Sequence, residues 1–181
     1  MFGKAYKRER RIRIYLIINV SYQNIMKFKI YNFLSDDAKI IRKQVFMEEQ
    51  GFKNEVEAIS DVTKQALHDA NVTFDDIDNI SFHIVMYDEN RPVATCRVYE
   101  DIVKNEYILG RLSVVKEYRG MSLGAKMIGE AERIVKGKGG TSIRLHAQCR
   151  VTPFYGQQGY KEYGVIEDDE GCPHIWMKKQ L

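Results

Sequence analysis

The sequence predicts an α+β fold in which helices flank a mixed, mostly antiparallel, twisted sheet. Three features predict it: short segments with alternating apolar residues, longer segments with apolar residues every three or four positions, and one strand–helix–strand succession. That succession implies a parallel strand pair with a right-handed crossover, whereas strands joined by tight turns are antiparallel neighbours. With 181 residues, 44% of them hydrophobic, the chain can fill one core and is short for two.

The first 25 residues form an N-terminal extension, and residues 26–181 form a single domain. The segment "KRERRIRIYLIINV" resembles a signal peptide, but its apolar part is short and no cleavage site follows. It is also shorter than the roughly 20 residues that a membrane-spanning helix needs. Its alternating apolar residues, from Ile12 to Val20, predict an additional strand. Because such a strand is costly to leave exposed, it would favour a homodimer; the natural start could equally be Met26.

The N-terminal half of the domain alternates strands and helices. Residues 27–33 predict a strand, and the next segment predicts a helix with Ser35 as its N-cap and Gly51 just beyond its end. A second helix is expected over residues 60–70. Residues 80–100 then predict two strands joined at Asp88-Glu89-Asn90.

The C-terminal half contains the clearest helix, which follows a strand over residues 107–115. Its apolar stripe consists of Leu123, Met127, Ile128, Ala131, Ile134 and Val135, and its polar side of Lys126, Glu130, Arg133 and Lys136. A strand over residues 141–147, a short helix over 151–158 and a closing strand pair around "DDEG" complete the domain.

Composition argues against several classes of function. The net charge is only +3, and the basic residues are scattered outside the N-terminus, which disfavours nucleic acid as a partner. Three cysteines without a Cys-x-x-Cys or a histidine pair predict neither a disulfide framework nor a metal site. Reduced cysteines and the lack of a membrane segment indicate a cytoplasmic protein.

The turn "YRGMSLGAKM" has the composition of an anion site. Its small residues, Gly120, Ser122, Gly124 and Ala125, keep bulk away from the start of the following helix, where free N–H groups and the helix dipole attract negative charge. The segment matches neither the dinucleotide fingerprint nor the P-loop. Taken by itself, it fits a simple tight turn as well as a phosphate site.

Further motifs make the chain resemble the GNAT superfamily of acetyl-CoA-dependent N-acetyltransferases, in a bacterial branch. "RGMSLG" is similar to the Arg/Gln-x-x-Gly-x-Gly/Ala signature at Arg119 and Gly124, with Ser122 in place of the usual middle glycine. "PFYGQQGY" is similar to the family's Phe-Tyr-x-x-x-Gly-Phe/Tyr element. "VFMEEQGF" and "CPHIWM" add to the resemblance, which spans residues 26–181 and implies a GNAT-like acyl-CoA N-acyltransferase fold.

The resemblance implies where acetyl-CoA binds. The backbone of one strand end would pair with the pantetheine amides as an added strand would, and the turn would hold the pyrophosphate. The residues implied are Leu112, Ser113, Val114, Arg119, Gly120, Met121, Ser122, Leu123, Gly124 and Ala125.

The resemblance also implies a proton donor. Tyr155 matches the tyrosine of the Phe-Tyr element, which in many members faces the CoA sulfur as general acid; the alternative is core packing beside Phe154. The amine must lose a proton before it attacks, and Glu48 and His174 are the candidates for this acceptor side, although a bound water could do the same. His83 and His146 are expected to be ordinary strand residues.

The implied reaction is transfer of the acetyl group of acetyl-CoA to a primary amine of a small molecule or a protein. The alternative is a non-catalytic acyl-CoA-binding or interaction protein on the same fold, because a fold does not determine a function. The expected partners are acetyl-CoA and the acceptor amine, with no nucleic acid, membrane or metal.

Overall fold

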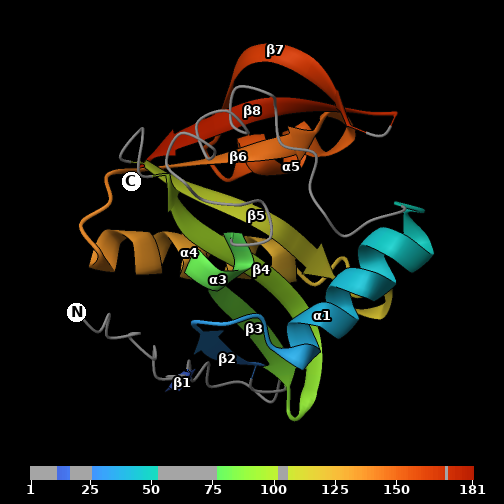
Figure 1. Cartoon of the computed structure of the whole chain (residues 1–181), viewed down its shortest axis with the longest axis vertical. Coiled ribbons are helices and arrows are strands. Elements are labelled where there is room, and N and C mark those ends of the chain that lie inside the picture. The colour runs from blue at the N-terminus through green and yellow to red at the C-terminus, as the bar shows by residue number, and fades with distance from the viewer. Residues whose placement is uncertain (1–11, 17–25, 53–76, 102–105, 170) are drawn as a thin grey trace, which may run out of the picture.

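The computed structural model describes residues 12–16, 26–52, 77–101, 106–169 and 171–181, and their strands form one sheet flanked by helices (Figure 1). The sheet has eight strands in the order β1-β2-β3-β4-β5-β6-β8-β7. The strands are β1 (Ile12–Leu16), β2 (Met26–Tyr31), β3 (Phe82–Asp88), β4 (Arg91–Asp101), β5 (Glu106–Val114), β6 (Ser142–Gln148), β7 (Lys161–Asp169) and β8 (Cys172–Gln180). The helices are α1 (Asp36–Arg42), η1 (Lys43–Glu49), α3 (Ile77–Ile80), η3 (Lys116–Tyr118), α4 (Leu123–Gly137), η4 (Cys149–Val151) and α5 (Thr152–Gln157).

The mixed, mostly antiparallel sheet confirms the predicted fold class. Among the described strands, β5 and β6 make the parallel pair, and α4 is the crossover between them. The predicted additional strand is present as β1, which pairs antiparallel with β2. The helix expected over residues 60–70 lies outside the described residues. None of the helices in the described ranges has the length and apolar character to cross a bilayer.

The strands β5 and β6 pair only near their beginnings. Tyr107 lies opposite Ile143 and Ile108 opposite Arg144, and these two strands do not pair with each other beyond these residues. On its other edge β5 stays paired with β4, with one extra residue in β5 at a bulge near Arg111, whose φ is +55°. The sheet therefore opens between β5 and β6, and β6, β7 and β8 diverge from the other strands (Figure 1).

The central strands are covered on both faces. In β3 the residues from His83 to Tyr87 are all buried, and in β4 those from Val93 to Tyr99 are. In Figure 1, α1 lies in front of this part of the sheet and α4 behind it. These two helices build one continuous core with the sheet and hold β5 in place.

The predicted apolar stripe of α4 is confirmed, but its polar side is not entirely exposed. Leu123, Met127 and Ala131 are buried, as the pattern requires. Glu130, predicted on the polar side, is also buried, and it accepts two hydrogen bonds from Arg133 at 2.9 and 2.7 Å. The prediction for Glu130 is wrong because an ion pair with the next turn of the helix allows a carboxylate to be covered.

The first predicted helix is divided in two. Ser35 caps α1 as predicted, its hydroxyl accepting from the Ala38 N–H at 3.3 Å, but the helix widens from α to π geometry at Lys43. Lys43 and Glu48 form an ion pair at 3.7 Å. They are five positions apart in the sequence, which is the spacing of one π-helical turn.

Candidate functional site

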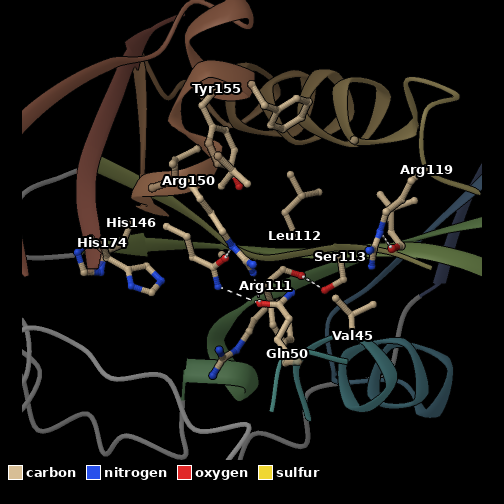
Figure 2. Close-up of a pocket in the computed structure, with 18 of the residues that line it drawn as sticks. Val45, Gln50, Arg111, Leu112, Ser113, Arg119, His146, Arg150, Tyr155 and His174 are labelled. Atoms are coloured by element: carbon tan, nitrogen blue, oxygen red, sulfur yellow. Dashed lines mark hydrogen bonds between the residues drawn. The ribbon is translucent and has the colours of Figure 1, made fainter. Parts of the chain in front are cut away.

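A cleft of about 1120 Å³ lies where β5 and β6 diverge. Its walls come from η1, the end of β5, the start of α4, and the opposite side formed by β6, η4, α5 and the β7–β8 turn. Figure 2 shows side chains from both walls pointing into it. Thus the opening of the sheet beyond the parallel pair forms a cleft with room for a ligand.

The end of β5 supplies one wall of this cleft. Leu112, Ser113 and Val114 line it, as the sequence predicts. The Ser113 hydroxyl donates to the Arg111 carbonyl at 3.1 Å, across the bulge. Because β6 has turned away, the β5 edge that faces it has no partner here among the described strands and is available to an extended ligand.

The predicted anion turn lies at the same cleft. Gly120 and Ser122 both have positive φ, +78° and +58°, and Ser122 is the N-cap of α4 without a capping side-chain hydrogen bond. The first N–H groups of α4 therefore stay open to a ligand. Of the predicted turn residues, Met121 is the exception: its side chain is exposed and does not line the cleft.

Gly124 explains why small residues are needed at the start of α4. A Cβ at this position would lie 3.0 Å from the ring carbon Cζ of Phe154. The Phe154 ring of α5 thus packs directly on the first turn of α4, which brings α5 to the cleft. The residues present fit a pyrophosphate, because Arg119 and the open first turn of α4 line the same part of the cleft, and a Cβ at Gly120 would meet no described atom within 4 Å.

Arg119 is held across the cleft by Glu49, a residue the sequence analysis did not select. Its guanidinium donates to the Val114 carbonyl at 3.0 Å and to both carboxylate oxygens of Glu49 at 2.5 and 2.7 Å. The hydrogen bond from Arg119 lowers the pKa of the Glu49 carboxyl. Glu48, the predicted acceptor-side residue, is exposed, pairs with Lys43 and is not part of the cleft wall.

Tyr155, the predicted proton donor, lies on α5 and faces the cleft (Figure 2). Its ring makes edge contacts with Phe154 and Tyr160 at centroid distances of 5.0 and 6.1 Å. Burial raises the pKa of Tyr155 above its ordinary value, and Cys96 nearby adds to this. The ring therefore packs in the core as in the alternative, while the residue also lines the cleft; its role as general acid stays a prediction.

His174 and His146 lie together at the other end of the cleft (Figure 2). His174 Nδ1 donates to the Cys172 carbonyl at 2.8 Å, so its Nε2 is the acceptor nitrogen of the neutral ring. The ring of His146, expected to be an ordinary strand residue, is 5.1 Å from that of His174 and stacks on Trp176 at 4.7 Å. The β6–β8 pairing, in which His146 is opposite Trp176, brings the histidines together; the order of residues in one strand does not reveal it.

His83 does not contribute to the cleft, as expected. It is buried in β3, and its Nε2 lies 2.9 Å from the Asp78 carbonyl, to which it donates. Its role is therefore structural.

Three polar side chains bridge the middle of the cleft. Arg150 of η4 donates from Nε to Gln148 at 2.9 Å and from Nη2 to Gln50 at 3.1 Å. The Gln148 amide also donates to Gln50 at 3.0 Å. This glutamine–arginine network joins the residue after η1 to the opposite wall and separates the histidines from the Ser113 side of the cleft (Figure 2).

Comparison with known proteins assigns this architecture to a family. The family model for the acetyltransferase (GNAT) domain matches residues 45–181. The chain belongs to the GNAT acetyltransferase family. This confirms the resemblance found in the sequence, and it makes the protein an acyltransferase.

Individual relatives agree with the GNAT assignment. A Bacillus subtilis protein with a provisional acetyltransferase assignment is 36% identical over 140 residues, which cover 77% of this chain and 85% of that protein. A Lactobacillus plantarum structure with a provisional N-acetyltransferase assignment has a TM-score of 0.67 at 26% identity. The match covers 86% of this chain and 98% of the Lactobacillus chain. An aminoglycoside 6'-N-acetyltransferase, solved with coenzyme A, shares the fold at a TM-score of 0.56 and 16% identity, covering 80% of this chain and 89% of its own.

Proposed function

We propose that this GNAT protein transfers the acetyl group of acetyl-CoA to a primary amine of a small molecule or a protein, with Tyr155 as the general acid. The observation that carries the proposal is the meeting of three elements at one cleft: the unpaired end of β5, the open first turn of α4, and Tyr155 of α5. We place the reaction in the cytoplasm, in keeping with the free thiols of Cys96, Cys149 and Cys172.

The cleft offers a site for each part of the donor. The backbone of Leu112 to Val114 would pair with the pantetheine amides, while the turn from Arg119 to Ala125 would hold the pyrophosphate. Coenzyme A use in the family supports this, since the aminoglycoside acetyltransferase of the same fold was solved with coenzyme A. Arg119 would exchange its Glu49 partner, wholly or in part, for phosphate oxygens.

The chemistry requires two proton transfers. The acceptor amine, once deprotonated, attacks the thioester carbonyl carbon; a C–N bond forms, the C–S bond breaks, and the leaving sulfur takes a proton. The Tyr155 hydroxyl is suited to donate that proton, because its raised pKa keeps it protonated through the neutral range. Tyr155 is then restored by a proton from water.

We assign removal of the amine proton to His174 rather than Glu48. His174 lines the cleft, and its Nδ1–H bond to the Cys172 carbonyl leaves Nε2 as the basic nitrogen. Glu48 lies outside the cleft wall and is exposed to solvent.

The proposal is tested by two measurements on the same preparation. Acetyl-CoA should raise the melting temperature in a saturable way, and addition of a panel of amines should release free CoA thiol with at least one of them. Thermal protection without thiol release from any small amine or lysine-containing peptide would instead support the non-catalytic acyl-CoA-binding alternative. If acetyl-CoA caused no thermal protection and no amine caused thiol release, the cleft would be ruled out as a CoA site.

A further inference from the structure

Arg150 differs from five other arginines of the chain in what it binds. Arg42, Arg97, Arg119, Arg133 and Arg144 all donate to carboxylates. Arg150 instead donates to the neutral amides of Gln50 and Gln148, and no described carboxylate makes an ion pair with it. Its charge thus lies in the cleft without an ion pair to a described carboxylate, and it acts on the Glu49 carboxylate only at longer range.

The glutamines hold one edge of this guanidinium and leave the other edge open. Arginine has five N–H groups, and the network uses one on Nε and one on Nη2 of Arg150. The remaining three include both N–H groups of Nη1 and one of Nη2, which form the outer fork of the group. Such a fork matches the two oxygens of a carboxylate, whereas a lysine would offer only a point charge.

The charges of the cleft disfavour a polycationic acceptor. Of the described residues that line it, Glu49 and Asp169 are acidic, and Glu49 is already paired with Arg119. Arg150 lies between the wall that carries Tyr155 and the end of η1 at Gln50 (Figure 2). An acceptor amine approaching this region therefore meets a fixed positive charge, which repels a polyamine and attracts an acidic group.

We propose that the acceptor is a small amine that also carries a carboxylate, as an amino acid does, and that Arg150 binds this carboxylate. The inference rests on the proposed acetyl transfer and names its acceptor class. Gln50 and Gln148 fix the orientation of the guanidinium, and His174 lines the same cleft. Arg150 acts in recognition and takes no proton.

The test compares acceptors that differ only in the carboxylate. Lysine is paired with cadaverine, and phenylalanine with phenylalaninamide, in the thiol-release assay at saturating acetyl-CoA. The amide lowers the pKa of the neighbouring amine and so favours attack; a preference for the free acid therefore reflects recognition. We expect kcat/KM for at least one acid to exceed that of its partner by about 10- to 100-fold, as one charge-assisted bidentate contact provides.

Variants separate recognition from a general loss of structure. Arg150→Gln should remove most of the preference by raising KM for the acid and lowering KM for the partner that lacks the carboxylate, with KM for acetyl-CoA unchanged. Arg150→Lys should restore part of it, because the charge returns without the fork. Arg91→Gln is the matched control, because it removes the same charge from an exposed ion pair with Glu117 outside the cleft. It should change neither the preference for the acid nor the KM for acetyl-CoA.

Equal or better use of cadaverine and phenylalaninamide would overturn the inference, as would an Arg150→Gln variant that slows both members of a pair alike. If none of these acceptors turns over, binding of lysine and phenylalanine to the CoA-saturated protein is measured by calorimetry. Binding that Arg150→Gln abolishes supports the carboxylate site even if the proposed acetyl transfer fails. No binding of either amino acid overturns it, whether or not other amines are acetylated.

Discussion

Ser122 occupies the position where the GNAT signature usually has glycine, and its backbone explains that preference. Its φ of +58° and ψ of +21° lie in the left-handed region, which a residue with a Cβ enters at a cost of roughly 1–2 kcal/mol. Its side chain makes no capping hydrogen bond that would offset this cost. The chain therefore keeps the backbone shape of the family turn with a less suitable residue.

Replacing Ser122 with glycine should relieve this strain without harming the anion site. We expect the variant to unfold at the same temperature or a few degrees higher, since the gain is partly offset by the greater entropy of unfolded glycine. The dissociation constant for acetyl-CoA should stay equal or fall, as calorimetry would show. Clearly weaker binding would mean that the Ser122 hydroxyl itself contacts the ligand.

Single residues also mark the limit of what the sequence predicts. Tyr155, Arg119 and the small residues of the turn were all predictable, because a motif fixes their spacing around one strand–helix junction. Whether Glu48 or Glu49 faces the cleft was not, since both end the same helix. Both residues belong to the π-helical segment η1, and no pattern of apolar residues distinguishes a π turn from an α turn.

At the scale of elements, the pair between Glu49 and Arg119 joins η1 to the turn before α4. Phosphate oxygens would compete with the Glu49 carboxylate for the same guanidinium. We expect Glu49→Gln to tighten acetyl-CoA binding by up to about fivefold, the range of a partly exposed ion pair. Glu48→Gln, which removes the neighbouring carboxylate outside the cleft, should leave the dissociation constant unchanged. Weaker binding in Glu49→Gln would show that Glu49 positions Arg119 for the phosphate.

A largely buried polar cluster connects α1, α3, β3 and β4. The Asp78 carboxylate of α3 pairs with Arg42 of α1 at 3.1 Å and with Arg97 of β4 at 2.9 Å, and His83 of β3 donates to the Asp78 carbonyl. Burial lowers the pKa of His83 to about 4, from an ordinary value of 6.5. The histidine is therefore neutral in the folded protein at pH 5 but protonated in the unfolded chain.

This difference predicts a loss of stability in weak acid. Because the unfolded state binds more protons between pH 6.5 and pH 4, the free energy of unfolding should fall by about 2 kcal/mol from pH 7 to pH 5 on account of His83. The variant His83→Gln, which keeps a donor for the Asp78 carbonyl, should lose that part of the pH dependence. Denaturant melts of both proteins at the two pH values measure it. An identical fall in the variant would assign the acid sensitivity elsewhere.

For the whole molecule, the sequence predicted the order and pairing of the elements better than the cleft between them. Alternation and tight turns predict neighbouring antiparallel strands, and one strand–helix–strand unit predicts the parallel pair. The cleft arises because β5 and β6 diverge after Ile108, and this depends on the bulge at Arg111 and on packing across the sheet. The same long-range pairing, not local sequence, brings His146, Gln148 and Arg150 to the site.

The N-terminal extension can be tested at this scale. The described residues that line the cleft all come from Val45 onward, so a chain that begins at Met26 should still fold and bind acetyl-CoA. Its melting temperature should fall because β2 becomes an exposed sheet edge. We propose that β1 also supports a homodimer; light scattering should then give the full chain twice the mass of the truncated protein. Equal melting temperatures and equal masses would contradict both expectations.

The central claim is that this cleft transfers an acetyl group with Tyr155 as the proton donor, and turnover of Tyr155→Phe tests it most directly. The change removes only the phenolic oxygen from a ring packed against Phe154 and Tyr160. With an active acceptor, kcat should fall by about 10²–10⁴-fold while KM for acetyl-CoA changes little. Since burial keeps the Tyr155 pKa above its ordinary value, the wild type should show no loss of this acid at mildly alkaline pH. Full turnover in the variant, with chemistry shown to be rate-limiting, would contradict the account.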